Sequence, residues 1–180
     1  MKNRRKFLKK SALAVTGLTF INSLSAKSYR KIIGSNDRIR IAFQGLGRRI
    51  PGLLSNAVSQ KNIEVTHLCD VMDHQITKAS KRLFDLKGVK VKSEKNIHKI
   101  FDDKEVDAVI MATPDHWHAY GACKAMESGK HVYLEKPCSH NMRESELLVS
   151  YQKHFNKVVQ MGNQQRSSPH TIELMNKIEK

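Results

Sequence analysis

The sequence predicts a doubly wound α/β fold with a mainly parallel sheet, and three observations lead to this prediction. Apolar runs of strand length alternate with helix-like stretches along residues 38–161. The run 106–112 (VDAVIMA) is apolar almost throughout, which is typical of a parallel strand buried on both faces. Gly45 and Gly47 directly follow the first strand-like run, at the carboxyl end where such sheets bind their ligands.

The expected elements follow one another along the chain with short connections. Strands are expected at 38–44, 63–69, 89–91, 106–112, 131–134 and 158–161. Helices are expected at 51–60, 73–86, 96–101, 116–128 and 141–155, and from 169 onward. Asp73 and Asp115 are expected to cap the helices that they precede. Asn141 and Glu144 have the spacing of a capping box.

The first 26 residues are expected to be an export signal and not part of the fold. A basic stretch precedes the mostly apolar residues 11–24, and Arg4-Arg5 resembles the signal of the twin-arginine pathway, which exports folded proteins. The apolar stretch is shorter than the roughly 20 residues of a membrane span, so signal removal is favoured over a retained anchor. We therefore expect a periplasmic protein without stable membrane insertion.

Charge and cysteine content bear on two further classes of protein. The net charge is +15, but six of the positive charges lie within residues 2–10 and the others are spread along the chain. The sequence has no arginine-rich run with interleaved aromatics and no zinc-finger or RNP motif, so we expect no nucleic-acid partner. Cys69, Cys123 and Cys138 lack a C-x-x-C spacing and are expected to be small core residues.

The segment 45–50 (GLGRRI) resembles the dinucleotide fingerprint G-x-G-x-x-G, in which backbone N–H groups approach a pyrophosphate. Ile50 stands in place of the third glycine, so an ordinary strand-to-helix turn is the alternative. Asp70 ends the second expected strand, where an acidic side chain binds the adenosine ribose hydroxyls. Its charge favours NAD over NADP, although Arg48 or Arg49 could offset the repulsion of a 2′-phosphate. The alternative for Asp70 is a helix cap.

Three later motifs complete a pattern that resembles the Gfo/Idh/MocA oxidoreductases, which include glucose-fructose oxidoreductase and inositol dehydrogenase. These motifs are 112–118 (ATPDHWH), 125–132 (AMESGKHV) and 135–137 (EKP), which match A-T-P-x-H-x-H, A-x-x-x-G-K-H-V and E-K-P. The resemblance covers about residues 39–166. Besides Ile50, the sequence departs from the family pattern at Asp115, where asparagine is common.

The resemblance implies a nicotinamide-binding Rossmann fold and hydride transfer to or from a hydroxyl of a sugar or cyclitol, a small-molecule substrate. Lys136 and His118 are the implied catalytic residues, with Lys136 holding or relaying the hydroxyl proton. Arg166 is expected to face the substrate or to be a surface charge. A metal is not expected at His116 and His118, because no further ligand has suitable spacing. The implied cofactor-binding residues are Gly45, Leu46, Gly47, Arg48, Asp70, Thr113, Pro114, His116, His118, Glu135 and Lys136.

The expected organisation is a linker at 27–37, a cofactor domain at 38–158, and at 159–180 a crossover into a second, truncated α/β domain. The 180 residues are expected to bind NAD but to show little turnover alone, and the full-length protein is expected to form a homo-oligomer. Two other functions stay open. One is an exported glycosidase that uses tightly bound NAD for transient oxidation at C3 and elimination, and the other is a noncatalytic nucleotide-binding relative.

Overall fold

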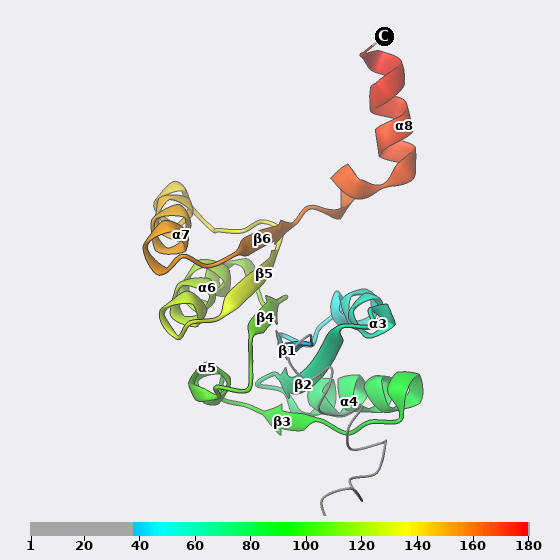
Figure 1. Cartoon of the computed structure of the whole chain (residues 1–180), viewed down its shortest axis with the longest axis vertical. Coiled ribbons are helices and arrows are strands. Elements are labelled where there is room, and N and C mark those ends of the chain that lie inside the picture. Colours follow the sequence, from blue (N-terminus) through cyan, green and yellow to red (C-terminus); the bar gives the residue numbers. More distant parts are fainter. Residues whose placement is uncertain (1–37, 180) are drawn as a thin grey trace, which may run out of the picture. The chain divides into compact units, whose positions relative to one another are not determined.

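A computed structural model of the chain describes residues 38–179. In this part of the chain, six parallel strands form one sheet in the order β3-β2-β1-β4-β5-β6 (Figure 1). The strands are β1 (Ile39–Gln44), β2 (Ile63–Cys69), β3 (Lys92–Glu94), β4 (Ala108–Met111), β5 (His131–Glu135) and β6 (Val159–Gly162). The chain moves outward from β1 to β3 and then returns to β4 on the other side of β1. This order confirms the doubly wound α/β fold.

Helices cover both faces of the sheet (Figure 1). On one face lie α3 (Ile50–Ser59) and α4 (Asp73–Lys87). On the other lie α5 (His98–Asp102), α6 (His118–Glu127) and α7 (Met142–Phe155). The remaining elements are the short 3₁₀ helices η2 (Asp115–Trp117) and η3 (Gln164–Ser167), and the helix α8 (Pro169–Ile178).

Alternate residues of the central strands enter two separate cores. Ile41 and Phe43 of β1 pack with α3 and α4, whereas Ala42 packs with α6 on the opposite face. This alternation explains why the central strands are apolar throughout. Full burial of a side chain such as Phe43 or Leu54 contributes about 1.5–3 kcal/mol to folding. All three cysteines pack in or against the core on the side of α6 and α7, and Cys69 is buried.

The strand expected at residues 89–91 is misplaced, because β3 instead covers Lys92–Glu94. Its residues are polar and pair with β2, with His67 opposite Lys92 and Cys69 opposite Glu94. An edge strand needs only one partner and can be largely exposed, so apolar content did not mark its position.

Two predicted caps are wrong and one is confirmed. Asp73 and Asp115 make no side-chain cap hydrogen bond, and Asp115 begins η2, so that α6 starts three residues later. The Asn141 side chain accepts a hydrogen bond from the Glu144 N–H at 3.0 Å. The Glu144 carboxylate in turn accepts from the N–H of His140 at 2.7 Å. The capping box therefore forms, with its return bond shifted by one residue.

The sheet continues past the domain boundary expected at residue 158. β6 pairs in parallel with β5, with Glu135 opposite Gly162, so residues 159–162 belong to the sheet and not to a crossover. α8 follows and has no buried residue. No helix within residues 38–179 is long and apolar enough to cross a membrane. The expected signal at 1–26 and linker at 27–37 lie outside the described residues.

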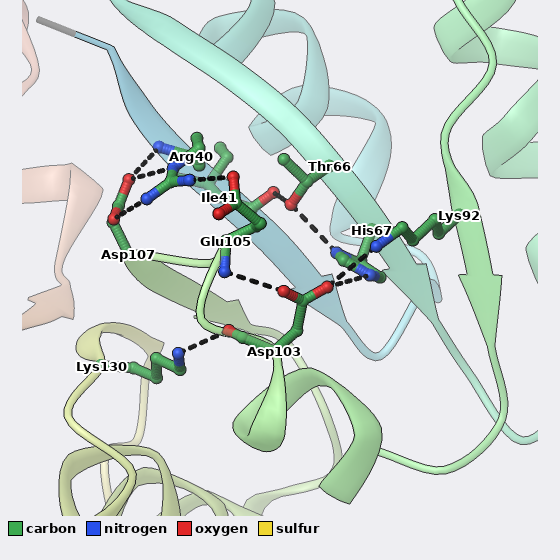
Figure 2. Close-up of polar contacts among 9 residues, drawn as sticks. All are labelled: Arg40, Ile41, Thr66, His67, Lys92, Asp103, Glu105, Asp107 and Lys130. Carbon is green, nitrogen blue, oxygen red and sulfur yellow. Dashed lines mark hydrogen bonds and ion pairs between the residues drawn. The ribbon is translucent and has the colours of Figure 1, made fainter. Parts of the chain in front are cut away.

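A polar network joins the loop before β4 to β1, β2 and β3 (Figure 2). The Asp107 carboxylate accepts three hydrogen bonds from Arg40, from its backbone N–H (2.8 Å), Nε (3.1 Å) and Nη2 (3.0 Å). The Asp103 carboxylate accepts from the N–H of Glu105 at 2.8 Å and from the Lys92 ammonium at 2.9 Å. The buried Lys130 ammonium donates to the Asp103 carbonyl at 2.6 Å.

These contacts shift the titration of the groups involved. The N–H of Glu105, followed by the Lys92 ammonium, holds the pKa of Asp103 below its ordinary value. Burial, followed by the charge of Lys92, lowers the pKa of His67. Both groups bind fewer protons in the folded chain than in the unfolded chain, so folding stability falls as the pH falls.

We predict that Asp103→Asn lowers the free energy of unfolding by about 1–2 kcal/mol at pH 7, because Lys92 loses a charged partner. Asp103 stabilises the fold fully above its unfolded pKa of about 4, and this contribution disappears as the pH falls through its lower folded pKa. Urea unfolding at pH values from 7 to 3 should therefore show the difference from wild type shrinking toward pH 3. The exposed Asp85→Asn variant is the control and should match wild type; a constant difference for Asp103→Asn would contradict the assignment.

Candidate functional site

A cleft of about 780 Å³ opens at the carboxyl ends of the central strands. The chain leaves β1 toward α3 on one face and leaves β4 toward α6 on the other, which creates a crevice between the two loops. The residues that line it come from the ends of β1, β2, β4 and β5. They are Gly45, Gly47, Arg48, Arg49, Asp70, Val71, Met72, Gln75, Ala112, Thr113, Pro114, Asp115, His118, Glu135 and Lys136.

The glycine loop lies directly against the end of β4. Gly45 has a φ of +79°, and a Cβ placed there would lie 2.8 Å from backbone atoms of Ala112 and Thr113. Only glycine fits this position, both for its backbone conformation and for the space around it. The N–H groups of Gly47 and Arg48 donate no hydrogen bond to another residue within 38–179, so they are available to an anion.

The residue at the third-glycine position of the fingerprint, Ile50, is part of the hydrophobic core. Ile50 is the first residue of α3 and only 1% exposed, and it packs in the core beneath the loop. The departure from the fingerprint therefore leaves the start of the helix in place.

Asp70 fastens the glycine loop to the end of β2. Its Oδ2 accepts from the N–H of Leu46 at 2.6 Å, and its Oδ1 accepts from the N–H of Met72 at 2.9 Å. A carboxylate has about four acceptor positions, so two remain for hydroxyl groups of a ligand. Leu46, which was predicted to bind the cofactor, does not line the cleft, because its side chain is buried and its N–H is bonded to Asp70.

His118 is almost fully buried and held in one tautomer. Its Nδ1 lies 2.6 Å from the carbonyl oxygen of Pro137, and because that oxygen can only accept, Nδ1 carries the hydrogen. Nε2 has no hydrogen-bond partner among the described residues, and neither has Oγ1 of Thr113. Buried polar atoms are rarely left without a partner. Both residues line the cleft, so their free atoms fit a polar ligand such as a dinucleotide.

The EKP motif forms the opposite side of the cleft from Asp70. Glu135 is buried and forms an ion pair with Arg49, whose Nε lies 2.7 Å from Oε1. This hydrogen bond raises the pKa of Arg49. Lys136 is exposed at the rim, and its ammonium pairs with no side chain of the described residues. An unpaired cation at this rim is available to a ligand.

The structure does not bring every predicted residue to the cleft. His116 is exposed and its ring lies beside that of Trp117, with 5.9 Å between centroids. Arg166 is exposed in η3 and does not line the cleft. A contact of either residue with cofactor or substrate therefore stays a prediction. In the described part of the chain, no group of three potential metal ligands occurs.

Sequence reasoning missed the residues that follow Asp70. Val71, Met72 and Gln75 line the main cleft, and Val71 also lines a neighbouring, mostly apolar hollow of about 280 Å³. Thr113 and Trp117 form part of this hollow. Val71, Met72 and Gln75 belong to no motif, and only their place after the end of β2 could have pointed to them.

The strand order, the glycine loop and the acid at the end of β2 define a dinucleotide-binding domain of the Rossmann type. The pattern of the Gfo/Idh/MocA oxidoreductase family, described as NAD-binding Rossmann fold, matches residues 39–163. The chain belongs to this family.

Individual relatives agree with the family. A glycosyl hydrolase family 109 protein of Shewanella pealeana is 29% identical over 153 residues, which are 75% of this chain and 33% of that protein. An NAD-binding protein from Listeria innocua has a TM-score of 0.63 and 27% identity, over 72% of this chain and 36% of that one. Myo-inositol 2-dehydrogenase from Lactobacillus plantarum has a TM-score of 0.65 and 22% identity, over 73% and 38%. The chain spans about a third of the length of the curated relatives it matches.

We predict that Gly45→Ala destabilises the chain more than Gly88→Ala does. Both glycines have a positive φ, but a Cβ at Gly88 meets no atom within 4 Å. Gly88→Ala should therefore cost only the strain of its backbone, about 1–2 kcal/mol. Gly45→Ala adds a backbone clash, which should cost about 1–3 kcal/mol more. Urea unfolding measures both values, and equal losses would show that the loop moves away from β4 without penalty.

Proposed function

We propose that this domain binds NAD and forms the cofactor half of an oxidoreductase that acts on a hydroxyl group of a sugar or cyclitol. One observation carries the proposal: His118, whose buried Nε2 has no partner among the described residues, and Lys136, whose ammonium is unpaired, line the same cleft as the glycine loop. A generic nucleotide site needs the loop and an acid, but it does not need a buried imidazole and a lysine at the far side.

The strand order gives the cofactor a direction across the cleft. Asp70 directly follows β2 and suits the adenosine ribose, whereas Lys136 directly follows β5, two strands beyond β1, at the nicotinamide end. A nicotinamide ring held there would accept or return a hydride. In the neutral ring, Nε2 of His118 accepts a hydrogen bond from a ribose or substrate hydroxyl. In the oxidation direction the neutral amine of Lys136 can accept the substrate hydroxyl proton, and in the reduction direction its ammonium can return a proton to the substrate oxygen.

The charge at Asp70 supports NAD over NADP. A 2′-phosphate would lie against a carboxylate that two backbone N–H groups already hold in place, so the carboxylate cannot turn away without freeing the loop. Arg48 lines the cleft and is the residue that would have to offset this repulsion.

We predict that NADH binds the chain at least about tenfold more tightly than NADPH, a difference of about 1.4 kcal/mol, in a fluorescence titration. Asp70→Asn removes the charge and should bring the two affinities close together, although NADH binding also weakens as the loop loosens. Asp73→Asn, three residues along and outside the cleft, should keep the wild-type ratio. Equal affinities for wild type, or a preference for NADPH, would refute the choice of NAD.

A second candidate is a glycosidase that uses bound NAD for transient oxidation, which the relative named as a glycosyl hydrolase supports. The export proposed from Arg4-Arg5 also supports it, because a cofactor recycled in place needs no external supply. Fractionation of cells that carry Arg4→Lys and Arg5→Lys would test export.

The two candidates differ in how they use the cofactor. We predict that a recycling enzyme joining this domain to a substrate domain retains NAD through purification and cleaves a nitrophenyl glycoside without added cofactor. An ordinary dehydrogenase instead requires added NAD and produces on the order of one NADH per product molecule. The absorbance of the reduced nicotinamide at about 340 nm measures this NADH. Absence of both activities, with NADH binding intact, would favour a noncatalytic relative.

A further inference from the structure

The ion pair between Arg49 and Glu135 joins two sides of the cleft. Arg49 immediately precedes α3 in the glycine loop, and Glu135 is the last residue of β5. β4 lies between β1 and β5 in the sheet, so the pair spans the end of a strand to which neither residue belongs. The Nε–Oε1 distance of 2.7 Å is that of a strong, charge-assisted hydrogen bond.

The surroundings of Glu135 leave room for this pair. Glu135 is 5% exposed, its Oε2 lies 3.3 Å from the backbone N of Lys136, and its Oε1 lies 3.5 Å from the Tyr133 hydroxyl. Gly162 of β6 lies opposite Glu135, and a Cβ there would be 2.5 Å from the Tyr133 hydroxyl and 3.1 Å from Oε1. A larger residue at Gly162 would force the Tyr133 hydroxyl to move and would press on the Glu135 carboxylate.

The pair also separates the tasks of two neighbouring arginines. Both arginines are exposed and line the cleft, but the Arg49 side chain pairs with Glu135, whereas Arg48 has no partner in the described part of the chain. A residue that serves only to attract phosphate would resemble Arg48. Arg49 instead connects the loop that binds the pyrophosphate to the backbone that carries Lys136.

We propose that Arg49 is a positioning residue that, through Glu135, places Lys136 against the nicotinamide half of the cofactor. The proposal rests on the proposed function, because it requires a dinucleotide that extends from Asp70 to Lys136. It predicts that loss of the pair weakens binding of the nicotinamide half while leaving the adenosine half intact. NADH and ADP are therefore the probes, since ADP lacks the nicotinamide half.

Arg49→Met should weaken NADH binding about tenfold and leave ADP binding within about twofold of wild type, by fluorescence and calorimetric titration. Arg49→Lys should recover part of the NADH affinity, because it keeps the charge but not the fixed geometry of a guanidinium. Arg143→Met is the matched control: it breaks an exposed arginine–glutamate pair on α7, and both affinities should stay at wild-type values.

The double variant Arg49→Met/Glu135→Gln tests whether the loss of NADH binding comes only from leaving the Glu135 carboxylate buried without a partner. It also replaces Arg49→Met as the test if that single variant fails to fold. It removes the uncompensated buried carboxylate, so thermal stability should recover while NADH binding stays about tenfold weaker than wild type. Recovery of both stability and NADH binding would overturn the proposal, as would an equal loss of NADH and ADP binding. If wild type binds ADP but not NADH, the proposed function fails together with this inference; if wild type binds both and the variants do too, only the inference fails.

Discussion

The contact between the glycine loop and the end of β4 is the constraint on which the site depends. Gly45 lies so close to the backbone of Ala112 and Thr113 that no side chain fits between them. Since β1 and β4 are neighbours whose connections leave on opposite faces, this contact brings the loop to the crevice at the reversal of the strand order. Asp70 then ties the loop to β2 through the N–H of Leu46. Contacts to backbone atoms thus hold the glycine loop in place at the cleft.

Polar groups at the two ends of the strands differ in whether they have hydrogen-bond or ion-pair partners. In the network around Asp103 and Asp107, the charged groups are paired, and these pairs stabilise the connections before β4 and β5. In the cleft, Nε2 of His118 and Oγ1 of Thr113 are buried without partners. A folded chain tolerates such atoms where a ligand satisfies them. The carboxylates of the cleft do have partners: Asp70 accepts from two backbone N–H groups, and Glu135 is paired with Arg49.

Much of the fold and part of the site could be predicted from the sequence. The apolar run around Val109 marked a central strand, and the capping box at Asn141 marked the start of α7, because both depend on residues close in sequence. β3 was misplaced because an edge strand is positioned by its pairing with β2 and not by its own apolar content. The caps expected at Asp73 and Asp115 failed for a related reason, since an aspartate near a helix start caps only if the local turn directs it there.

The sequence by itself determined the order of the strands and helices and the family, because periodicity and short motifs are local properties of the chain. It also identified most residues of the cleft through those motifs. Only the tertiary structure decided which polar atoms already have a hydrogen-bond partner. The Asp70 carboxylate accepts from the backbone of the glycine loop, and Nδ1 of His118 is bonded to a backbone carbonyl, which leaves Nε2 without a partner among the described residues. Arg49 pairs with Glu135 across the end of β4. These facts depend on contacts between residues far apart in the sequence, which only the packing of strands and loops brings together.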